Sequence, residues 1–229
     1  MNRKIIIYSE FTFLPGLLLL ALGTALTEKA ALGMSMVVAP AYVIYLFVSG
    51  IYPWFTFGMA EYLFQALLIV LLSLFLRRLK PGYLFSFMTA VIYGILLDLM
   101  MKLTGSLQAV TMLMRLVLFG GGLVLCALGV ALLFHTYIPP EAYELIVKEL
   151  VSAYNLPLAR TKTVYDCISA VTAVVLSFLC FGFGTFAGVG PGTIFSAVVN
   201  GALIGAFSGL LEKYCDFPDM LGGREFFTS

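Results

Sequence analysis

The chain has 229 residues, of which 62% are hydrophobic and 11% are charged, and its mean hydropathy is +1.05. This composition excludes a soluble globular domain and predicts a multi-span membrane protein. The net charge is +1 with no basic tract, so nothing in the charge pattern indicates a nucleic-acid partner. The four cysteines lack metal or redox spacing, and we expect structural roles for Cys126, Cys167, Cys180 and Cys215.

The first half of the chain contains three predicted membrane spans, at about 11–26, 57–76 and 83–103. Between the first two lies an apolar segment, 33–50, that is broken by a glycine and a proline. Its unbroken part is too short to cross ~30 Å of hydrocarbon, so we expect it to be re-entrant or to lie in the interface. Trp54 follows, in a position that suits the aromatic belt at a membrane surface.

The second half repeats this layout, with spans expected at about 111–134, 163–182 and 193–211. Its counterpart of the short apolar segment is 135–155, which carries Pro139, Pro140 and several charged residues. Placing these charges in lipid would be costly, so this segment cannot be a span. We expect an amphipathic interfacial helix that begins after the two prolines.

The two halves also share a repeated sequence. Three separated strings align at offsets of 105 to 107 residues: Leu22-Gly23-Thr24-Ala25-Leu26 with Leu128-Gly129-Val130-Ala131-Leu132, Glu61-Tyr62 with Asp166-Cys167, and Thr89 to Gly94 with Ser196 to Gly201. A constant offset of this kind predicts an internal duplication. Because each half contains an odd number of spans, the two halves must be inverted relative to each other in the membrane.

The distribution of positive charge supports this topology. With both termini in the cytoplasm, ten of the 13 lysines and arginines are cytoplasmic, which satisfies the positive-inside rule: Arg3, Lys4, Arg77, Arg78, Lys80, Lys148, Arg160, Lys162, Lys213 and Arg224. The cation-rich loop 77–80 aligns with the uncharged turn 182–192, as inverted halves require. An eight-span protein with parallel halves is the alternative, and it would place the charged stretch 141–149 in lipid.

The predicted fold is therefore an all-α membrane protein of six transmembrane helices in two inverted three-helix repeats, with a re-entrant or interfacial segment in each half. The whole chain, 1–229, is expected to form a single transmembrane domain. Repeat 1 covers about 11–103 and repeat 2 about 111–211.

Three acidic residues lie within predicted spans, where an ionisable side chain is a functional candidate by default. Asp98 lies deepest, and the alternative for it is a local ion pair with Lys102, four residues later. Glu61 and Asp166 occupy the same repeat position near the start of their spans. In inverted halves we expect them at opposite faces of the membrane, either as vestibule carboxylates that attract a cation or proton, or as first-turn acids that complement the helix dipole.

Polar and glycine residues in the third and sixth spans supply further candidates. Tyr93 and Asn200 are repeat mates near mid-span, and they either line a central cavity or bond between helices. Gly201, Gly205 and Gly209 form a small-xxx-small ladder on the sixth span, which predicts tight helix packing.

A glycine-rich string, 188–193, precedes the sixth span. Gly190, Gly192 and Thr193 could bring backbone N–H groups together around an anion or polar ligand at the helix start, and a tight extracellular turn is the alternative. His135, the single histidine, has no partner at ligand spacing, so we expect no metal and no cofactor. No Ser/His/Asp or Cys/His group indicates an enzyme.

The small-residue first helix leading to Leu32-Gly33-Met34-Ser35, the duplicated layout and the Gly188-Val189-Gly190-Pro191-Gly192-Thr193 string together resemble the YczE/YitT-like family of bacterial membrane proteins. The resemblance covers most of the chain. It implies a protein of the bacterial cytoplasmic membrane, and it supplies no substrate.

We expect a transporter that moves a small solute by alternating access, because inverted repeats with non-spanning helices recur in transporters. A proton or cation bound by the acids could be the coupling ion. The alternatives are a non-transporting membrane module that binds a partner protein, and the substrate-binding subunit of a multi-component importer. The expected partners are the lipid bilayer, a small-molecule or ion substrate and, in the alternatives, another membrane protein or a second copy of the chain.

Overall fold

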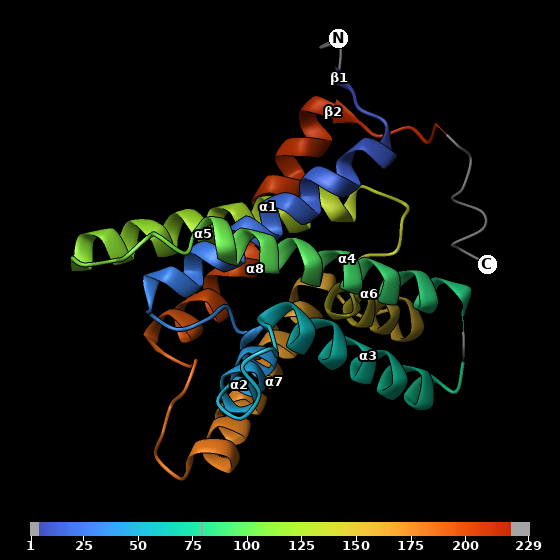
Figure 1. The fold of residues 1–229 in the computed structure, drawn as a ribbon. Coiled ribbons are helices and arrows are strands. Elements are labelled where there is room, and N and C mark those ends of the chain that lie inside the picture. The colour runs from blue at the N-terminus through green and yellow to red at the C-terminus, as the bar shows by residue number, and fades with distance from the viewer. Residues whose placement is uncertain (1–4, 79, 221–229) are drawn as a thin grey trace.

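The computed structural model describes residues 5–78 and 80–220. Within these residues the fold is helical, apart from a short parallel pairing of β1 (Ile5–Ile6) with β2 (Cys215–Asp216). The helices are shown in Figure 1: α1 (Ser9–Ala30), α2 (Ala39–Ser49), α3 (Phe57–Leu76), α4 (Pro81–Leu103), α5 (Met112–Phe134), α6 (Ala142–Tyr154), α7 (Leu158–Phe181) and α8 (Pro191–Tyr214).

Six helices of the described chain, α1, α3, α4, α5, α7 and α8, are long and apolar enough to cross a membrane. They coincide with the six predicted spans to within a few residues at each end. Their outer faces carry large apolar side chains such as Leu74 and Leu179, which are 69% and 77% exposed. Such faces suit contact with lipid, and the chain is a multi-pass, all-helical membrane protein.

Helices α1 and α5 make the most extensive helix contact in the fold, and they cross antiparallel. Gly16 lies against the backbone of Gly129, and Gly23 lies against the backbone of Gly122. A Cβ atom added at Gly23 would lie 2.6 Å from the Gly122 carbonyl oxygen, closer than real Cβ contacts allow. The glycines therefore permit the two backbones to touch.

The short helices α2 and α6 both begin inside the protein and end at its surface. Ala39, which begins α2, is buried, whereas Phe47 near its end is exposed. In α6, Ala142 is buried and Tyr154 is exposed. Each of these helices packs on both α3 and α7. Each therefore enters the bundle by its N-terminal end.

The expected amphipathic interfacial helix in 135–155 differs from the structure. The six consecutive residues from Ala142 to Val147 are buried, so the first half of α6 lies within the helix bundle, and the rest of the helix leads to the exposed Tyr154. The charge of Glu144 is compensated there by Lys162 of α7, at 2.6 Å, and not by water. Of the charges that argued against burial, that of Glu144 is thus neutralised within the bundle.

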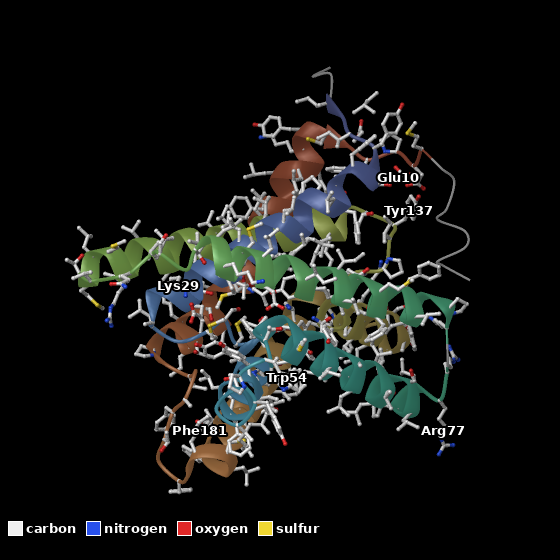
Figure 2. All side chains as sticks on the ribbon, in the orientation of Figure 1. Glu10, Lys29, Trp54, Arg77, Tyr137 and Phe181 are labelled. Carbon is white, nitrogen blue, oxygen red and sulfur yellow. The ribbon has the colours of Figure 1, made fainter. Side chains whose placement is uncertain are left out.

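Both ends of the described chain lie together, where β1 runs beside β2 (Figure 1). At this end the Tyr137 hydroxyl donates a hydrogen bond to Glu10 Oε1 at 3.0 Å, joining the α5–α6 loop to the start of α1. In Figure 2, Trp54 and Phe181 lie at the far end of the molecule from Glu10 and Tyr137. Three predicted cytoplasmic cations lie outside the described residues: Arg3, Lys4 and Arg224.

Candidate functional site

Charged and polar side chains from three helices meet around the N-terminal end of α6. We call this group the polar centre, and each of its members is at most 5% exposed: Glu61 and Gln65 of α3, Glu141, Tyr143 and Glu144 at the start of α6, and Lys162 and Asp166 of α7. Removing a charge from water costs several kcal/mol unless it is well paired. A buried concentration of ionisable groups is therefore the first candidate for a functional site in a membrane protein.

On the α3 side, Gln65 connects two carboxyl groups. Its side-chain amide nitrogen lies 3.0 Å from Glu141 Oε2 and 3.4 Å from Glu61 Oε2. Its Oε1 accepts the backbone N–H of Ala142, the first residue of α6, at 3.0 Å. The Tyr143 hydroxyl donates to Glu61 Oε2 at 2.8 Å. The partners shown for these two carboxyl groups are thus neutral hydrogen-bond donors.

On the α7 side, Lys162 supplies the positive charge of the centre. Its Nζ lies 2.6 Å from Glu144 Oε1 and 3.3 Å from Asp166 Oδ1. Lys162 and Asp166 are one helical turn apart, so they project from the same face of α7. The polar centre therefore contains four carboxyl groups and a single ammonium group.

Several oxygens of this region have no hydrogen-bond partner among the described residues. They are Glu61 Oε1, Glu141 Oε1, Glu144 Oε2, both carboxyl oxygens of Asp166 and, on α8, Asn200 Oδ1. A buried acceptor without a partner costs about 1–3 kcal/mol, so such atoms in a native protein usually meet a proton, water or a ligand.

A cavity of about 30 Å³ adjoins the polar centre. The start of α6 contributes Glu141 and Glu144 to its lining, and α4 and α8 contribute Tyr93 and Asn200. The Tyr93 hydroxyl lies 3.0 Å from the Thr24 hydroxyl, which also lines the cavity. The volume suits one water molecule or an ion of similar size. The repeat mates Tyr93 and Asn200 thus lie on one small internal cavity.

Glu141 lies outside the spanning helices, and its buried environment shifts its pKa. Burial raises the pKa of Glu141 well above the usual range, and the nearby Glu61 carboxylate raises it further. The hydrogen bond from Gln65 and the charge of Lys162 act in the opposite direction. Glu141 therefore keeps its proton at pH values where an exposed glutamate has lost it.

We expected Glu61 and Asp166 to lie apart, at opposite faces of the membrane. The structure differs from this expectation. Both side chains are fully buried, and both belong to the network around α6. Glu61 accepts from Tyr143, while Asp166 pairs with Lys162, which holds Glu144. The reason is that α6 is inserted between α3 and α7 and so reaches both acids.

Asp98 lies outside the polar centre and caps a helix. Its Oδ2 accepts the Thr56 hydroxyl at 2.7 Å, and its Oδ1 accepts the Gly58 N–H at 2.8 Å. Thr56 is the N-cap of α3, so the carboxylate compensates the exposed donors and the dipole at this helix end. The alternative expected for Asp98, a pair with Lys102, differs from the structure, where the Lys102 side chain is exposed.

The glycine string before α8 uses its amide groups inside the protein. The Gly192 N–H donates to the Leu32 carbonyl at 2.8 Å, and the Gly190 N–H donates to the buried Thr193 hydroxyl at 3.1 Å. A Cβ atom at Gly190 would collide with the Leu32 carbonyl. The string therefore docks the start of α8 against the α1–α2 loop, and these amides are not free to hold an anion.

The predicted tight packing of the glycine ladder on α8 is wrong for the single chain. A Cβ atom added at Gly201, Gly205 or Gly209 would meet no atom within 4 Å. The three glycines instead line an open groove of about 270 Å³ beside Phe134. Small residues permit close approach of another helix but do not force it, and within the described chain no helix fills this groove.

A second, larger pocket of about 420 Å³ lies at the end of the molecule that carries Tyr137. We call it the vestibule. Pro140 lines the vestibule, and the next residue, Glu141, lines the small cavity. The Pro139 and Pro140 carbonyls accept hydrogen bonds from the hydroxyls of Thr89, at 2.9 Å, and Ser86, at 2.6 Å. A short stretch of backbone, held by α4, thus stands between vestibule and cavity.

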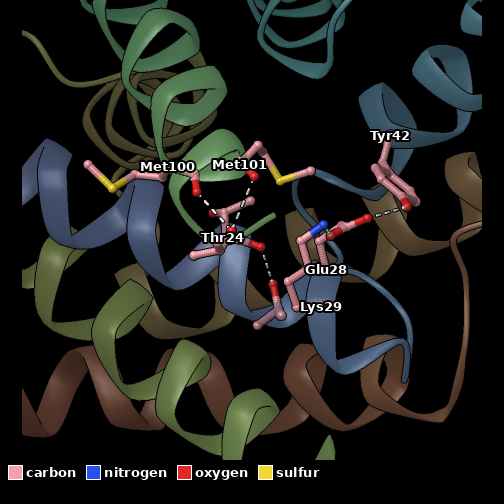
Figure 3. Close-up of polar contacts among 8 residues, drawn as sticks. Thr24, Glu28, Lys29, Tyr42, Met100 and Met101 are labelled. Atoms are coloured by element: carbon pink, nitrogen blue, oxygen red, sulfur yellow. Dashed lines mark hydrogen bonds and ion pairs between the residues drawn. The ribbon is translucent and has the colours of Figure 1, made fainter. Parts of the chain in front are cut away.

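A further ionisable contact lies at the opposite end of α1. The Tyr42 hydroxyl of α2 donates to Glu28 Oε1 at 3.3 Å, and Glu28 Oε2 pairs with Lys29 at 3.0 Å (Figure 3). This contact ties the end of α1 to α2. It is the counterpart, at the far end of α1, of the Tyr137–Glu10 bond near the vestibule.

Sequence reasoning missed five members of the polar centre: Gln65, Glu141, Tyr143, Glu144 and Lys162. The repeat itself contained a usable signal, because 135–155 is the mate of 33–50. A re-entrant position for one segment implies the same position for the other, which would have brought Glu141 and Glu144 inside. The pairing of Lys162 with Glu144 had no local signal.

The fold and the polar centre define a multi-pass helical membrane protein with a buried, ionisable interior. The chain belongs to a family of unknown function (DUF6198), whose model matches residues 7–209. It is 29% identical over 208 residues to the uncharacterized protein YyaS of Bacillus subtilis (strain 168), an alignment that covers 87% of this chain and 92% of that protein. No solved structure matches the chain. The resemblance to YczE/YitT-like proteins stays a prediction.

Proposed function

We propose that this protein is a transporter that moves a small solute across the membrane by alternating access, with a proton or another cation as the coupling ion. The polar centre carries this proposal. Its four carboxyl groups share one ammonium group, so protons or another cation must compensate the remaining charge. The charge of the centre then depends on what is bound there, which is the property that ion coupling requires.

The α1–α5 crossing supports two inverted halves. In the repeat alignment Gly16 corresponds to Gly122, and Gly23 corresponds to Gly129. The contact of Gly16 with Gly129 therefore maps onto the contact of Gly122 with Gly23. Two antiparallel helices whose contacts map onto each other when the helices are interchanged are related by a two-fold axis perpendicular to both. In a membrane such an axis lies in the membrane plane, as in transporters with inverted repeats.

The short helices connect the halves across this axis. Helix α2 of the first half packs on α7 of the second, and α6 of the second half packs on α3 of the first. The hydrogen bonds from Gln65 to Glu141 and from Tyr143 to Glu61 both join one half to the other. A rocking motion of the halves would break these bonds and change the proton affinity of the acids, which links the conformation to the bound ion.

We place the protein in the bacterial cytoplasmic membrane with both termini on the cytoplasmic side. The adjacent β1 and β2 strands support a shared side for the termini. The excess of lysine and arginine in the loops on that side supports its assignment to the cytoplasm.

The test is a flux measurement with purified protein in liposomes that contain the pH-sensitive dye pyranine. A panel of small solutes is added outside while a potassium diffusion potential, negative inside, draws cations inward. We expect at least one solute to change the internal pH, and the double variant Glu61→Gln, Glu141→Gln to abolish this response. Glu212→Gln, at the exposed end of α8, is the matched control and should keep it. Correctly inserted protein that moves no solute in the panel and no protons would contradict the proposal.

A non-transporting module that binds a partner membrane protein is the second candidate. The open groove along Gly201, Gly205 and Gly209 favours it, because a small-residue stripe suits a helix from another protein. Bulky substitutions such as Gly205→Leu would then abolish co-purification of the partner, whereas under the transport proposal they would leave solute flux intact.

A further inference from the structure

The hydrogen-bonding character of the small cavity restricts what can bind in it. The lining residues Glu141, Glu144 and Asn200 each present a side-chain oxygen without a partner among the described residues. Asn200 is only 5% exposed, so bulk water does not satisfy its side-chain oxygen. A ligand for this cavity must therefore bring hydrogen-bond donors.

The hydroxyl groups in the lining are engaged with other groups, and the Asn200 side-chain amide is the lining group that also carries N–H donors. The hydroxyls of Thr24 and Tyr93 bond to each other at 3.0 Å. The Tyr143 hydroxyl donates to Glu61, outside the cavity lining. Lys162 does not line the cavity, and its ammonium group is held by Glu144 and Asp166. The cavity thus offers unpaired oxygens of two acidic side chains and one amide, a combination that favours a cation with N–H donors over an anion.

The geometry also separates classes of cation. Among the described residues no group of three or more His, Cys, Asp or Glu side chains is arranged to hold a metal ion. A nitrogen cation suits the lining better, because its N–H groups point in separate directions and can each reach one acceptor. Tyr93 and Tyr143 also line the cavity, and aromatic rings attract such a cation.

Size and apolar contacts narrow the class further. The volume of about 30 Å³ suits one ammonium group, and a larger head group would require the lining to open. The lining also contains four aliphatic side chains: Leu20, Val37, Val38 and Val130. These side chains can contact a methyl or other short alkyl group attached to the nitrogen.

We propose that this cavity binds a small ammonium-type cation, ammonium or a short primary alkylammonium, whose N–H groups donate to Glu141, Glu144 and Asn200. This inference rests on the proposed transport function and names the substrate class for it. Where Glu141 is protonated before binding, it becomes a carboxylate as the cation enters, and its proton is released to the solution. Binding then releases protons, and the affinity rises with pH below the pKa of the ammonium ion.

The experiment is equilibrium binding of radiolabelled methylammonium to the purified full-length protein in detergent. We expect saturable binding that ammonium displaces and that tetramethylammonium, which has the charge but no N–H donor, does not. Asn200→Leu should weaken binding by about tenfold or more, which is the loss expected for one hydrogen bond to a charged group. Asn200→Asp keeps an acceptor oxygen in place and should retain binding, and Glu212→Gln serves as the unchanged control.

The outcomes separate this inference from the transport proposal when pyranine liposomes are assayed in parallel. Absence of methylammonium binding, or equal displacement by tetramethylammonium, overturns the ammonium inference even if another solute drives proton flux. Binding that is lost in Asn200→Leu and kept in Asn200→Asp supports it even if no flux is seen, and the transport proposal alone then fails.

Discussion

Gln65 of α3 and Glu141 at the start of α6 are 76 residues apart in the chain, yet their side chains share a buried hydrogen bond of 3.0 Å. The same glutamine accepts the Ala142 N–H and donates to Glu61. One neutral side chain thus joins α3 to α6 and accepts the first backbone N–H of the short helix α6. This contact is one of several that hold the start of the short helix α6 in the bundle, together with those of Tyr143 and Glu144.

Replacing Gln65 is therefore expected to destabilise the protein. Gln65→Met preserves the side-chain volume but removes the hydrogen-bond partner of Glu141 and of the Ala142 N–H, and one of the two donors to Glu61. This loss should lower the free energy of unfolding by about 2–4 kcal/mol. Thermal unfolding in detergent measures this change. Gln108→Met, at an exposed loop position, is the matched control and should leave stability within about 0.5 kcal/mol of the original protein. Equal effects of the two substitutions would show that the Gln65 contacts are dispensable.

The raised pKa of Glu141 predicts a specific pH dependence of stability. Because the folded protein keeps a proton on Glu141 that the unfolded chain loses near pH 4.5, this residue lowers the stability progressively as the pH rises above 4.5. Glu141→Gln removes the titration, so the variant should gain stability relative to the original protein as the pH increases. Melting temperatures of both proteins from pH 4.5 to 8 measure the difference. A constant difference across this range would mean that Glu141 titrates normally.

The hydroxyls of Ser86 and Thr89 are expected to keep the cavity closed toward the vestibule. Ser86→Ala with Thr89→Val removes both hydrogen bonds to the Pro139 and Pro140 carbonyls, so the intervening backbone should open more often. Cys126 lines the cavity and is 5% exposed, which makes it a natural reporter.

The measurement is the rate of maleimide labelling of Cys126 after the other three cysteines have been changed to serine. We expect slow labelling in the original background and a rate about tenfold higher in the double variant. This ratio corresponds to a decrease of about 1.4 kcal/mol in the free energy needed to open the backbone. Ser73→Ala removes a hydroxyl that bonds within α3 and should not change the rate. An unchanged labelling rate in the double variant would show that these hydroxyls do not hold the backbone between the vestibule and the cavity.

The α1–α5 crossing should tolerate no side chain at its centre. A Cβ atom at Gly23 would lie 2.6 to 2.7 Å from the Gly122 oxygen and the Cys126 nitrogen, so Gly23→Ala should separate the helices and destabilise the fold by about 1–3 kcal/mol or more. Gly121→Ala, on the same crossing helix α5, meets no atom within 4 Å and should be neutral or stabilising. Thermal unfolding of the two variants measures the difference. Equal stability would show that the helices do not touch at Gly23.

The inverted arrangement predicts opposite sides for two loops at equivalent repeat positions. In a protein without other cysteines, a cysteine at Thr56 should react with an impermeant maleimide added to intact cells, whereas a cysteine at Arg160 should react only after the cells are opened. The Arg160 variant in opened cells is its own control for reactivity. Labelling of both positions from outside would establish parallel halves and would remove the structural basis for alternating access.

Much of the fold could be predicted because its determinants are local. The length and hydropathy of a segment decide whether it can cross ~30 Å of hydrocarbon, and the six predicted spans match α1, α3, α4, α5, α7 and α8 closely. The burial of the first half of α6 was not predicted, because its hydropathy was judged without its partner. A buried Lys162 supplies the counter-charge, and no property of residues 142–154 alone reveals it.

The sequence by itself determined the six apolar spans, because hydropathy is a property of consecutive residues. The duplication that it indicates stays a prediction. The tertiary structure alone decided that Glu61 and Asp166 both face α6, that Asp98 caps α3, and that the α8 glycines line an open groove. These outcomes depend on distances between helices that are far apart in the chain. The energy of a buried charge is set by the groups within a few ångströms, and only the packed bundle determines which groups those are.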